Sequence, residues 1–500
     1  MPTVAIKLIP LGKTLHVEEG TPLQDVLFDY GVEFPCGGMG KCKGCRVKVL
    51  EGELPVTEGQ ENLFTPQQLE EGWRLACQYR ADRDLTLEIG QFETPILADE
   101  SRFDYTPADA YGIAIDLGTT TIVGQLVDCR TGRIAAVESC LNPQAQFGAD
   151  IMSRIEYALK DNQRAQLCHL IREQIYALIH TLLQETARDV PLQNIYICGN
   201  TAMHHFFCEI DTTPLSQYPF TTNQLGQMTY KADELGWDLP DNPAITFLPN
   251  LGGFVGSDVL AGVLATRMHE RENPIALVDL GTNGEIVIGN KEKILCASTA
   301  AGPAFEGGRV SIGMRASTGA ISSAQIYDGS LQCHVIGHGE PRGICGSGLV
   351  DVVACAMELE WIKSNGAFTG EMEQLVLSPK IALSQKDIRE LQLAKAAIAA
   401  GIQIILNQLQ LAADDVEHFY LAGAFGNYLN PLNARWIGLF PFSAQKVVSA
   451  GNTALLGTKM ALLNPALCEE EFHSVLQNLD HFCLSSDAGF HNVFIDQMVF

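Results

Sequence analysis

Residues 112–127 read GIAIDLGTTTIVGQLV, and residues 275–288 read IALVDLGTNGEIVI. In both stretches an apolar segment ends in Asp-Leu-Gly-Thr and a second apolar segment follows, a pattern that predicts two β-hairpins. The shared aspartates, Asp116 and Asp279, lie 163 residues apart. A repeat at this distance indicates two related lobes rather than a short solenoid repeat.

The residue types of these hairpins suit a nucleoside triphosphate with Mg²⁺. An aspartate at the end of an apolar strand can hold Mg²⁺ through water, and the following glycine allows a turn whose amides face phosphate oxygens. We therefore expect Asp116 and Asp279 to be the catalytic residues. The expected phosphate contacts are Gly118, Thr119, Thr120, Gly281, Thr282 and Asn283. Glu285 and Glu306 are weaker candidates for positioning water, and a structural role is the stronger expectation for both.

A third element, FYLAGAFGNY at residues 419–428, predicts a strand followed by a glycine-rich turn. On its own this motif is weak, but it follows the two hairpins in order. Its small residues would let the backbone approach a flat base or ribose. The expected adenosine contacts are Gly423, Ala424 and Gly426.

The N-terminal segment carries a separate cysteine pattern. Cys36, Cys42 and Cys45 have the spacing C-x5-C-x2-C, and Cys77 follows inside Arg-Leu-Ala-Cys-Gln. Four thiolates can hold a [2Fe–2S] cluster, and the glycines among the first three leave room for a loop around it. Structural zinc is the alternative, although zinc sites usually pair two short cysteine knuckles.

Composition excludes several other classes of function. The 500 residues include 33 Lys and Arg against 59 Asp and Glu, a net charge of −26 that would repel a nucleic acid backbone. No apolar run is long enough for a membrane span, and the first residues alternate like a strand instead of forming a signal peptide. We expect a cytoplasmic protein whose 15 cysteines are thiols or metal ligands.

Two further groups of residues have competing interpretations. The basic residues Lys41, Lys43, Arg46 and Lys48 surround the cysteine loop and could meet an acidic partner, but a solvated surface is the stronger expectation. His204 and His205 lie in apolar sequence, so buried or capping roles are favoured over metal binding.

Residues 1–93 resemble the β-grasp ferredoxins, with one residue more than the plant-type cysteine spacing. The two hairpins and the glycine-rich turn resemble the phosphate-1, phosphate-2 and adenosine motifs of the acetate and sugar kinase, heat-shock chaperone and actin superfamily. The fold class implied is α+β and α/β, a ferredoxin domain followed by a two-lobed ribonuclease-H-like ATPase. The expected boundaries are a linker at 94–110, a first lobe at 111–270 and a second lobe at 271–500. Helices are expected within 150–188 and 386–410, from their apolar spacing.

A ferredoxin followed by such an ATPase resembles the reductive activators of corrinoid-dependent enzymes. That resemblance implies ATP-dependent transfer of one electron from a [2Fe–2S] cluster to Co(II) of a corrinoid protein, which restores Co(I). It also implies an upstream electron donor or reductase and a homodimer formed through the ATPase. Longer family members carry an extra small domain for which 95–111 leaves no space, so the partner surface is expected to differ.

Three alternative functions stay open at the level of sequence. An activator of a radical dehydratase or another low-potential enzyme would use the same ATPase fold, although those relatives share a [4Fe–4S] cluster across a dimer. A small-molecule kinase with a redox-sensing domain would phosphorylate a sugar or an acid. A ferredoxin on a decayed ATPase scaffold would not hydrolyse ATP.

Overall fold

The structure is a computed structural model that describes most of the chain. The described residues are 2–9, 13–27, 30, 32, 40, 45–89, 105–148, 150–160, 163–184, 191–218, 220–281, 283–306, 309–314, 316, 319–336, 340–426, 429–484, 487 and 489–500. The side chains of residues 58, 303, 306, 424, 425 and 467–469 lie outside this described part. Among the described helices, none is both long and apolar enough to cross a membrane.

The N-terminal unit is a five-stranded sheet of the β-grasp type. Its strands run in the order β2 (Lys13–Glu18), β1 (Thr3–Ile9), β7 (Leu85–Ile89), β4 (Arg46–Glu51) and β5 (Trp73–Leu75). β1 is parallel to β7, and the other neighbouring strands are antiparallel. The alternate residues Val4, Ile6 and Leu8 of β1 are buried in the core, as the period of a half-buried strand requires. The remaining elements are β3 (Thr21–Pro22), α1 (Leu23–Leu27), α2 (Glu58–Glu61), α3 (Pro66–Glu70) and β6 (Arg80–Ala81).

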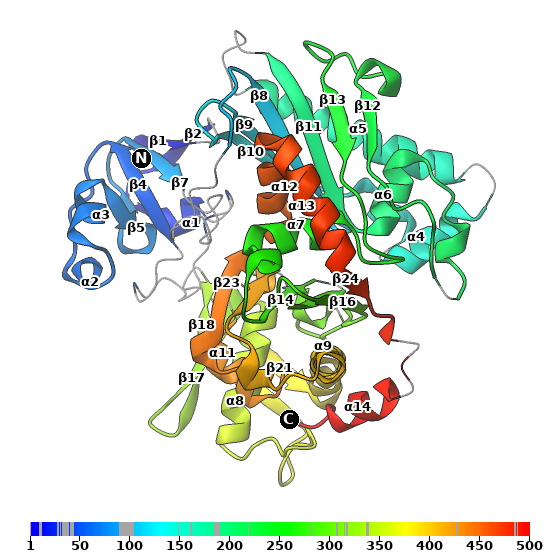
Figure 1. The fold of residues 1–500 in the computed structure, drawn as a ribbon. Coiled ribbons are helices and arrows are strands. Elements are labelled where there is room, and N and C mark those ends of the chain that lie inside the picture. Colours follow the sequence, from blue (N-terminus) through cyan, green and yellow to red (C-terminus); the bar gives the residue numbers. More distant parts are fainter. Residues whose placement is uncertain are drawn as a thin grey trace.

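The first lobe is built on a six-stranded sheet (Figure 1). Its order is β10 (Arg133–Leu141), β9 (Thr121–Asp128), β8 (Tyr111–Leu117), β11 (Leu192–Gly199), β13 (Ala244–Phe247) and β12 (Met228–Lys231). β8, β9 and β10 form an antiparallel meander, and β11 and β13 add in parallel to β8. Its helices are α4 (Ile151–Ala158), α5 (Gln163–Gln184) and α6 (Thr201–Cys208). The helical sequence expected within 150–188 therefore forms two helices, since Lys160-Asp161-Asn162 interrupts the apolar spacing.

The second lobe repeats five strands of this order, and its sixth strand, β24 (Leu479–His481), lies at the opposite edge of the sheet from β12. Its sheet runs β23 (Val447–Gly451), β22 (Phe419–Ala422), β14 (Ile275–Leu280), β15 (Gly284–Gly289), β16 (Ile294–Thr299) and β24. The meander β14–β15–β16 corresponds to β8–β9–β10, and β22 and β23 correspond to β11 and β13. The two hairpins predicted from the Asp-Leu-Gly-Thr repeat are thus confirmed as equivalent strands of two like sheets.

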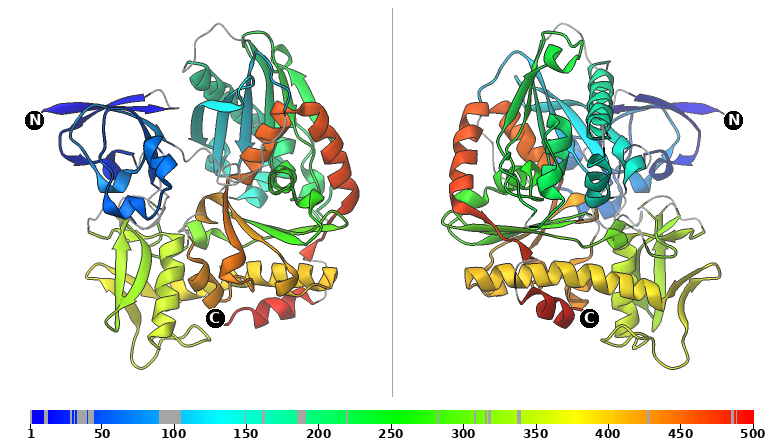
Figure 2. Two further views of the ribbon diagram at one scale, coloured as in Figure 1. Left: turned by 60° about the vertical axis from the view of Figure 1, so that its left-hand side comes forward. Right: turned by 90° about the vertical axis from the view of Figure 1, so that its right-hand side faces the viewer.

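Further elements complete the second lobe. The long helix α9 (Gln385–Leu409) lies along it, in yellow in Figure 2, and starts one residue before the predicted position. A small sheet has the order β18 (Ser330–Val335), β17 (Ala320–Tyr327) and β19 (Gly343–Ile344), and β20 (Gln374–Ser378) pairs with β21 (Ile381–Ser384). The other helices are α8 (Gly346–Glu358), α10 (Gly423–Gly426), α11 (Pro431–Trp436) and α14 (Phe490–Asp496).

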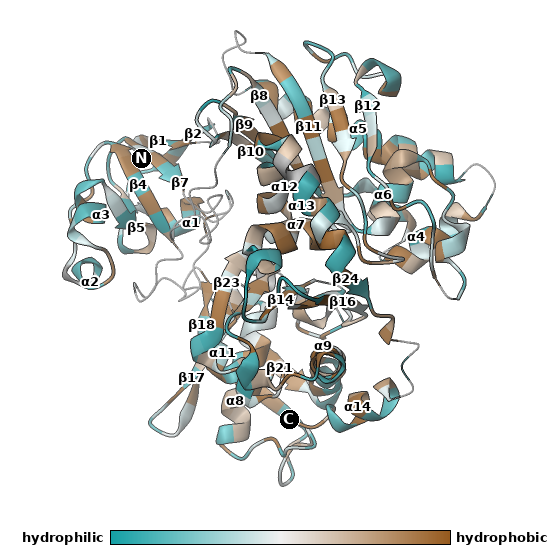
Figure 3. Ribbon diagram, viewed as in Figure 1, coloured by the Kyte–Doolittle hydropathy of each residue, from teal (hydrophilic) through white to brown (hydrophobic). Residues whose placement is uncertain are grey.

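Helices α7 (Ser257–Thr266) and α12 (Thr453–Leu463) pack against each other between the two large sheets. Every residue of α7 except Asp258 is buried, and Figure 3 shows the helix as largely hydrophobic. A shared core joins residues of both lobes around these helices, including Cys198, Leu277 and Ala454. α12 also contacts β8 and β11, and α13 (Pro465–Asn478) follows it. The first lobe therefore takes a helix from the C-terminal region, beyond the boundary expected at 270–271.

Candidate functional site

The turn between β8 and β9 is tight enough to require glycine. The amide of Gly118 donates to the carbonyl oxygen of Thr121 over 3.1 Å, which closes the hairpin. A Cβ atom on Gly118 would lie 2.5 Å from that oxygen, closer than real Cβ contacts. The sequence prediction that glycine makes a tight phosphate-type turn here is consistent with this geometry.

Two asparagines hold this turn from outside the hairpin. The side-chain amide of Asn142 donates to the carbonyl oxygen of Gly118 over 3.0 Å, and that of Asn200 donates to the Thr119 hydroxyl over 2.9 Å. The side-chain oxygen of each accepts a backbone N–H at the start of a helical segment, from Gln144 and Met203 respectively. Because capping fixes each side chain, the turn is oriented before any ligand arrives.

A third asparagine reaches the turn from the far end of the chain. Asn452 caps α12 by accepting from the amide of Leu455 over 2.7 Å. Its side-chain amide donates to Asp116 Oδ2 over 2.7 Å. Asp116 is thereby held by a helix that also packs on α7, the helix that leads into the second lobe.

Four carboxylates gather between the two hairpins: Asp116, Asp258, Asp279 and Glu285. Burial is the largest cause of a raised pKa in each: about 6 for Asp116, about 7 for Asp258 and Asp279, and well above the usual range for Glu285. Electrostatic repulsion raises these pKa values further. Asp116 raises the pKa of Asp258 and of Asp279, and Asp258 and Asp279 together raise the pKa of Glu285. All four side chains keep some exposure to solvent. A divalent cation would relieve this repulsion, so the donor set fits Mg²⁺.

Helix α7 and strand β15 bring two of these acids to the cluster. Asp258 lies in the first turn of α7, and Ser257 beside it exchanges two 3.1 Å hydrogen bonds with the backbone of Gly199 at the end of β11. Glu285 lies directly across from Asp279 in the β14–β15 hairpin and accepts from Ser298 at 3.5 Å. Sequence reasoning gave Asp258 no role and ranked Glu285 as structural; the structure adds both to the cluster.

The adenosine-type turn follows β22 directly beside Asp279. Ala422 pairs in register with Asp279, and Gly423 comes next with φ +81°. A Cβ atom on Gly423 would lie 2.5 Å from Asp279 Oδ1, so glycine is needed both for the dihedral angle and for space. The turn forms the short helix α10, which ends at the buried Gly426.

Two of the predicted nucleotide contacts, Thr282 and Ala424, lie wholly or partly outside the described residues. The amide of Gly281 donates to the carbonyl oxygen of Asn283 over 3.0 Å, which closes the second hairpin. Thr282 between them lies outside the described residues, and so do the side chains of Ala424 and Glu306. Thr120 accepts a backbone hydrogen bond from Asn142, within the same turn as Thr119.

In the N-terminal unit, strand pairing brings Cys45 and Cys77 together. Arg46 at the start of β4 pairs with Leu75 at the end of β5, and the amide of Ala76 donates to the carbonyl oxygen of Cys45 over 2.9 Å. The two cysteines flank this paired end. Cys45 is fully buried and Cys77 is partly exposed.

Gly40, five residues before Cys45, lies close to the same strand end. A Cβ atom on Gly40, at φ +69°, would lie 2.6 Å from the side-chain nitrogen of Gln78, which itself donates to Cys77 Sγ at 3.5 Å. Cys36 and Cys42 lie outside the described residues. Gly40 lies beside Gln78 and Cys45 is hydrogen-bonded to Ala76, so both residues adjoin the neighbours of Cys77, and this placement fits a [2Fe–2S] cluster.

The remaining candidates fall into two groups. Arg46 and Lys48 each lie over the ring of Trp73, at 5.7 and 5.9 Å, while Lys41 and Lys43 lie outside the described residues. His204 and His205 are buried, and His205 Nδ1 lies 2.9 Å from the carbonyl oxygen of Thr201. The prediction of buried roles for the two histidines is confirmed.

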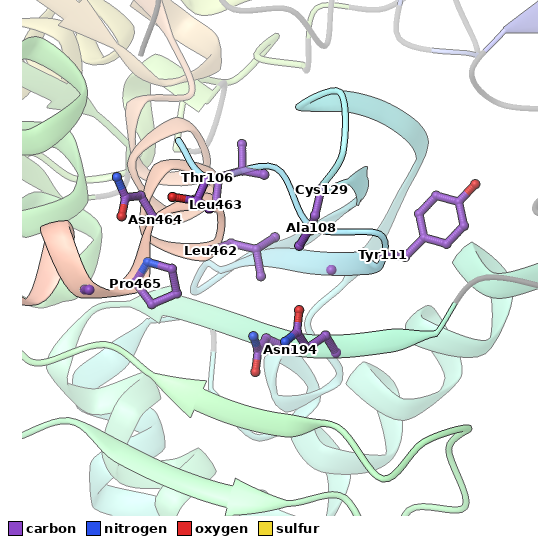
Figure 4. Close-up of a pocket in the computed structure, with 12 residues that line it drawn as sticks. Thr106, Ala108, Tyr111, Cys129, Asn194, Leu462, Leu463, Asn464 and Pro465 are labelled. Carbon is purple, nitrogen blue, oxygen red and sulfur yellow. The ribbon is translucent and has the colours of Figure 1, made fainter. Parts of the chain in front are cut away.

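A cavity of about 360 Å³ lies at the opposite end of β8 (Figure 4). Tyr111 and Cys129 line one side of it, and Leu462 and Pro465 at the α12–α13 junction line another. Tyr111 begins β8 and Asp116 is five residues further, about 17 Å along an extended strand. The cavity is therefore separate from the acid cluster.

Comparisons with known families cover nearly the whole chain. Residues 6–82 match the 2Fe-2S iron-sulfur cluster binding domain, residues 111–271 match the RACo middle region, and residues 273–500 match the C-terminal ASKHA domain of RACo. The chain is also 34% identical, over 98% of both chains, to the corrinoid activation enzyme RamQ of Eubacterium limosum. This chain belongs to the family of reductive corrinoid activators.

Two further proteins that are similar to this chain are also described as corrinoid activators or reductases. A reductase from Methanosarcina barkeri, specific for the Co(II) form of the methylated amine-specific corrinoid protein, is 26% identical over 78% of this chain and 76% of its own length. The solved structure of a reductive activator for corrinoid, iron-sulfur protein superposes with a TM-score of 0.71 at 27% identity, covering 99% of this chain and 98% of its own. The fold class predicted from the sequence, a ferredoxin domain followed by an actin-like ATPase, is confirmed.

Proposed function

We infer that this protein uses ATP to pass one electron to the Co(II) centre of a corrinoid protein and so restores Co(I). One observation carries the inference. A single chain, similar over 98% of its length to a corrinoid activation enzyme, holds a cysteine pair in a ferredoxin sheet and an acid-lined turn between two ATPase lobes.

On the ATPase side, we propose Mg²⁺ held by Asp116 and Asp279. Asp258 and Glu285 add negative charge behind it, and Asn452 orients Asp116. The turn at Gly118 and Thr119 would present its amides and hydroxyl to phosphate oxygens. The further phosphate and adenosine contacts proposed are Thr120, Gly281, Thr282, Asn283, Gly423, Ala424 and Gly426.

On the electron-transfer side, we propose that Cys36, Cys42, Cys45 and Cys77 hold the [2Fe–2S] cluster, which supplies one-electron transfer. The chain's own contribution is the close approach of Gly40 to Gln78, beside Cys77, and the burial of Cys45. Arg46 and Lys48 keep two positive charges on the adjoining strand.

ATP is needed because the reduction is energetically uphill. For a one-electron couple, each 59 mV of unfavourable potential lowers the equilibrium constant about tenfold. Closure of the two lobes on nucleotide would move α7 and α12, because these helices pack between the sheets and carry Asp258 and Asn452. We propose that this closure alters the complex with the corrinoid protein so that the transferred electron is trapped.

The proposed function requires an electron acceptor and an electron donor. The electron acceptor is a corrinoid protein, and an upstream donor or reductase refills the cluster. A homodimer formed through the ATPase lobes is also proposed. The cytoplasmic location expected from the cysteine thiols stays a prediction.

The test is an anaerobic assay with reduced, cluster-loaded protein and a Co(II) corrinoid protein from the same organism. The visible spectrum is followed with and without Mg-ATP. Growth of the Co(I) band only with Mg-ATP supports the proposal. A competent cluster that produces no Co(I) with any resident corrinoid protein contradicts it, and ATP-dependent phosphorylation of a sugar or acid would favour the kinase alternative.

A further inference from the structure

Three potential metal ligands come together where the chain leaves the first lobe. His269 and Glu270 lie in the single turn η8 (Met268–Glu270), directly after α7, and Glu471 lies in α13. One ring nitrogen of His269 and one carboxylate oxygen of each glutamate all lie within 4.8 Å of one another. Bonds of 2.0–2.2 Å to a tetrahedral ion hold ligand atoms about 3.4 Å apart, so small side-chain rotations would complete the site.

His269 is a largely buried imidazole with an incomplete set of hydrogen bonds. Its side chain is 9% exposed, and the backbone of Val263 interacts with the ring, but within the described part of the chain neither ring nitrogen makes a hydrogen bond of ordinary geometry. Its Nε2 lies 3.7 Å from Glu270 Oε1. Buried polar groups are normally satisfied, so an orphan nitrogen facing two carboxylates points to an absent ligand. Burial also lowers the pKa of His269, which favours the neutral form that binds metals.

Glu270 is already oriented by a neighbour. Its Oε2 accepts from Arg267 Nε over 2.7 Å and lies 2.6 Å from Arg267 Nη2, which leaves Oε1 directed at His269. Arg267 ends α7 in the left-handed region, at φ +53°, and this bend sets η8 beside α13. Outer partners that fix one oxygen of a ligating carboxylate are a regular feature of metal sites.

Glu471 supplies the third ligand from α13, which packs on α7. Burial raises its pKa and the nearby Glu270 raises it further, while Arg267 lowers it. A divalent cation between the two glutamates would remove their repulsion and satisfy the imidazole at the same time. The nitrogen donor favours zinc or a similar borderline metal over Mg²⁺ or Ca²⁺, which prefer oxygen.

We propose that His269, Glu270 and Glu471 form a Zn²⁺-type site that ties the lobe junction to α13. The bound ion would link η8, which follows α7, to the helix that leads into β24 of the second sheet. Because Asp258 of the acid cluster lies in the first turn of α7, the bound ion would stabilise the helix that runs from the acid cluster to the proposed metal site. This proposal is independent of the corrinoid activity.

The test titrates Zn²⁺ into the full-length, cluster-loaded protein after treatment with a chelator, against a chromophoric competitor. Glu471→Gln should weaken Zn²⁺ binding at least about tenfold, since even outer partners of a metal site contribute that much. The matched control is Glu470→Gln, an exposed neighbour on the same helix that should bind as the wild type does. Equal affinity of wild type and Glu471→Gln would overturn the proposal. If Glu471→Gln does not fold, Glu270→Gln takes its place with the same expectation.

X-ray absorption at the zinc edge separates this site from the cysteine loop and does not detect iron. In a sample with one Zn²⁺ per chain, nitrogen and oxygen at about 2.0–2.2 Å are expected. Sulfur at about 2.3 Å would place the zinc on cysteines and overturn the proposal.

Discussion

The side-chain amide of Asn452 donates a 2.7 Å hydrogen bond to Asp116, which lies 336 residues earlier in the chain. The same asparagine caps α12 through its oxygen, so one side chain both starts a helix and orients the first-lobe aspartate. Because α12 packs on α7, the position of Asp116 is coupled to the helix that carries Asp258.

Replacing Asn452 by Asp should reduce ATP hydrolysis while the helix cap survives. Aspartate is a good cap, but it places a second carboxylate against Asp116 and removes the donor. A hydrogen bond to a charged group contributes about 1.5–3 kcal/mol, so we expect a loss of roughly tenfold to a hundredfold in kcat/KM for Mg-ATP. Steady-state ATPase measurements check this. The control Asn430→Asp caps α11 and should stay near wild type, and equal losses in both variants would contradict the role of Asn452.

The stability of the Mg²⁺-free protein should fall as pH rises from about 4 to 7. The folded pKa of Asp258 and of Asp279 is about 7 and that of Asp116 is about 6, against 3.8 for an unperturbed aspartate. Between these values the folded chain binds more protons than the unfolded chain, so the free energy of unfolding decreases with pH.

Thermal unfolding of wild type and Asp258→Asn from pH 5 to pH 8 tests this dependence. The variant removes one carboxylate and its repulsion, so its Tm should decrease less across the range. Added Mg²⁺ should raise the wild-type Tm more at pH 8 than at pH 5, since protons no longer compete for the oxygens. Identical pH profiles for the two proteins would count against a coupled acid cluster.

Gly423→Ala should abolish tight nucleotide binding. The new Cβ atom meets Asp279 Oδ1 at 2.5 Å and must also adopt φ +81°. Gly329→Ala is the matched control, because Gly329 has φ +70° with nothing within 4 Å of an added Cβ atom. The control should lose about 1 kcal/mol of stability and retain affinity for Mg-ATP, measured by calorimetry. Comparable binding by both variants would exclude a close approach at Gly423.

Cys77→Ser should remove or strongly weaken the visible absorption of the cluster and abolish Co(II) reduction. ATP hydrolysis should remain, because Cys77 belongs to the N-terminal sheet and the acid cluster to the two other sheets. The control is Cys483→Ser. Cys483 follows strand β24 of the second lobe, so this variant should keep the full cluster spectrum. Retention of an unchanged cluster in Cys77→Ser would show that the fourth ligand lies elsewhere.

Local patterns made the elements predictable. The alternation of Val4, Ile6 and Leu8 indicated a strand because only one face of it is buried. The Asp-Leu-Gly-Thr repeat identified two hairpins because a turn this tight requires glycine, as the contact between Gly118 and Thr121 shows. The helical sequence expected within 150–188 forms two helices, α4 and α5, whose ends the apolar spacing did not predict.

The two hairpins, the spacing of the cysteines and the family can be inferred from the amino-acid sequence alone, because these features depend on residues close together in the chain or on whole-length similarity. The grouping of Asp258 and Glu285 with Asp116 and Asp279, and the hydrogen bond from Asn452 to Asp116, become visible in the folded chain. Those relationships arise when the two large sheets pack around α7 and α12, because a local pattern does not show which distant side chains then meet.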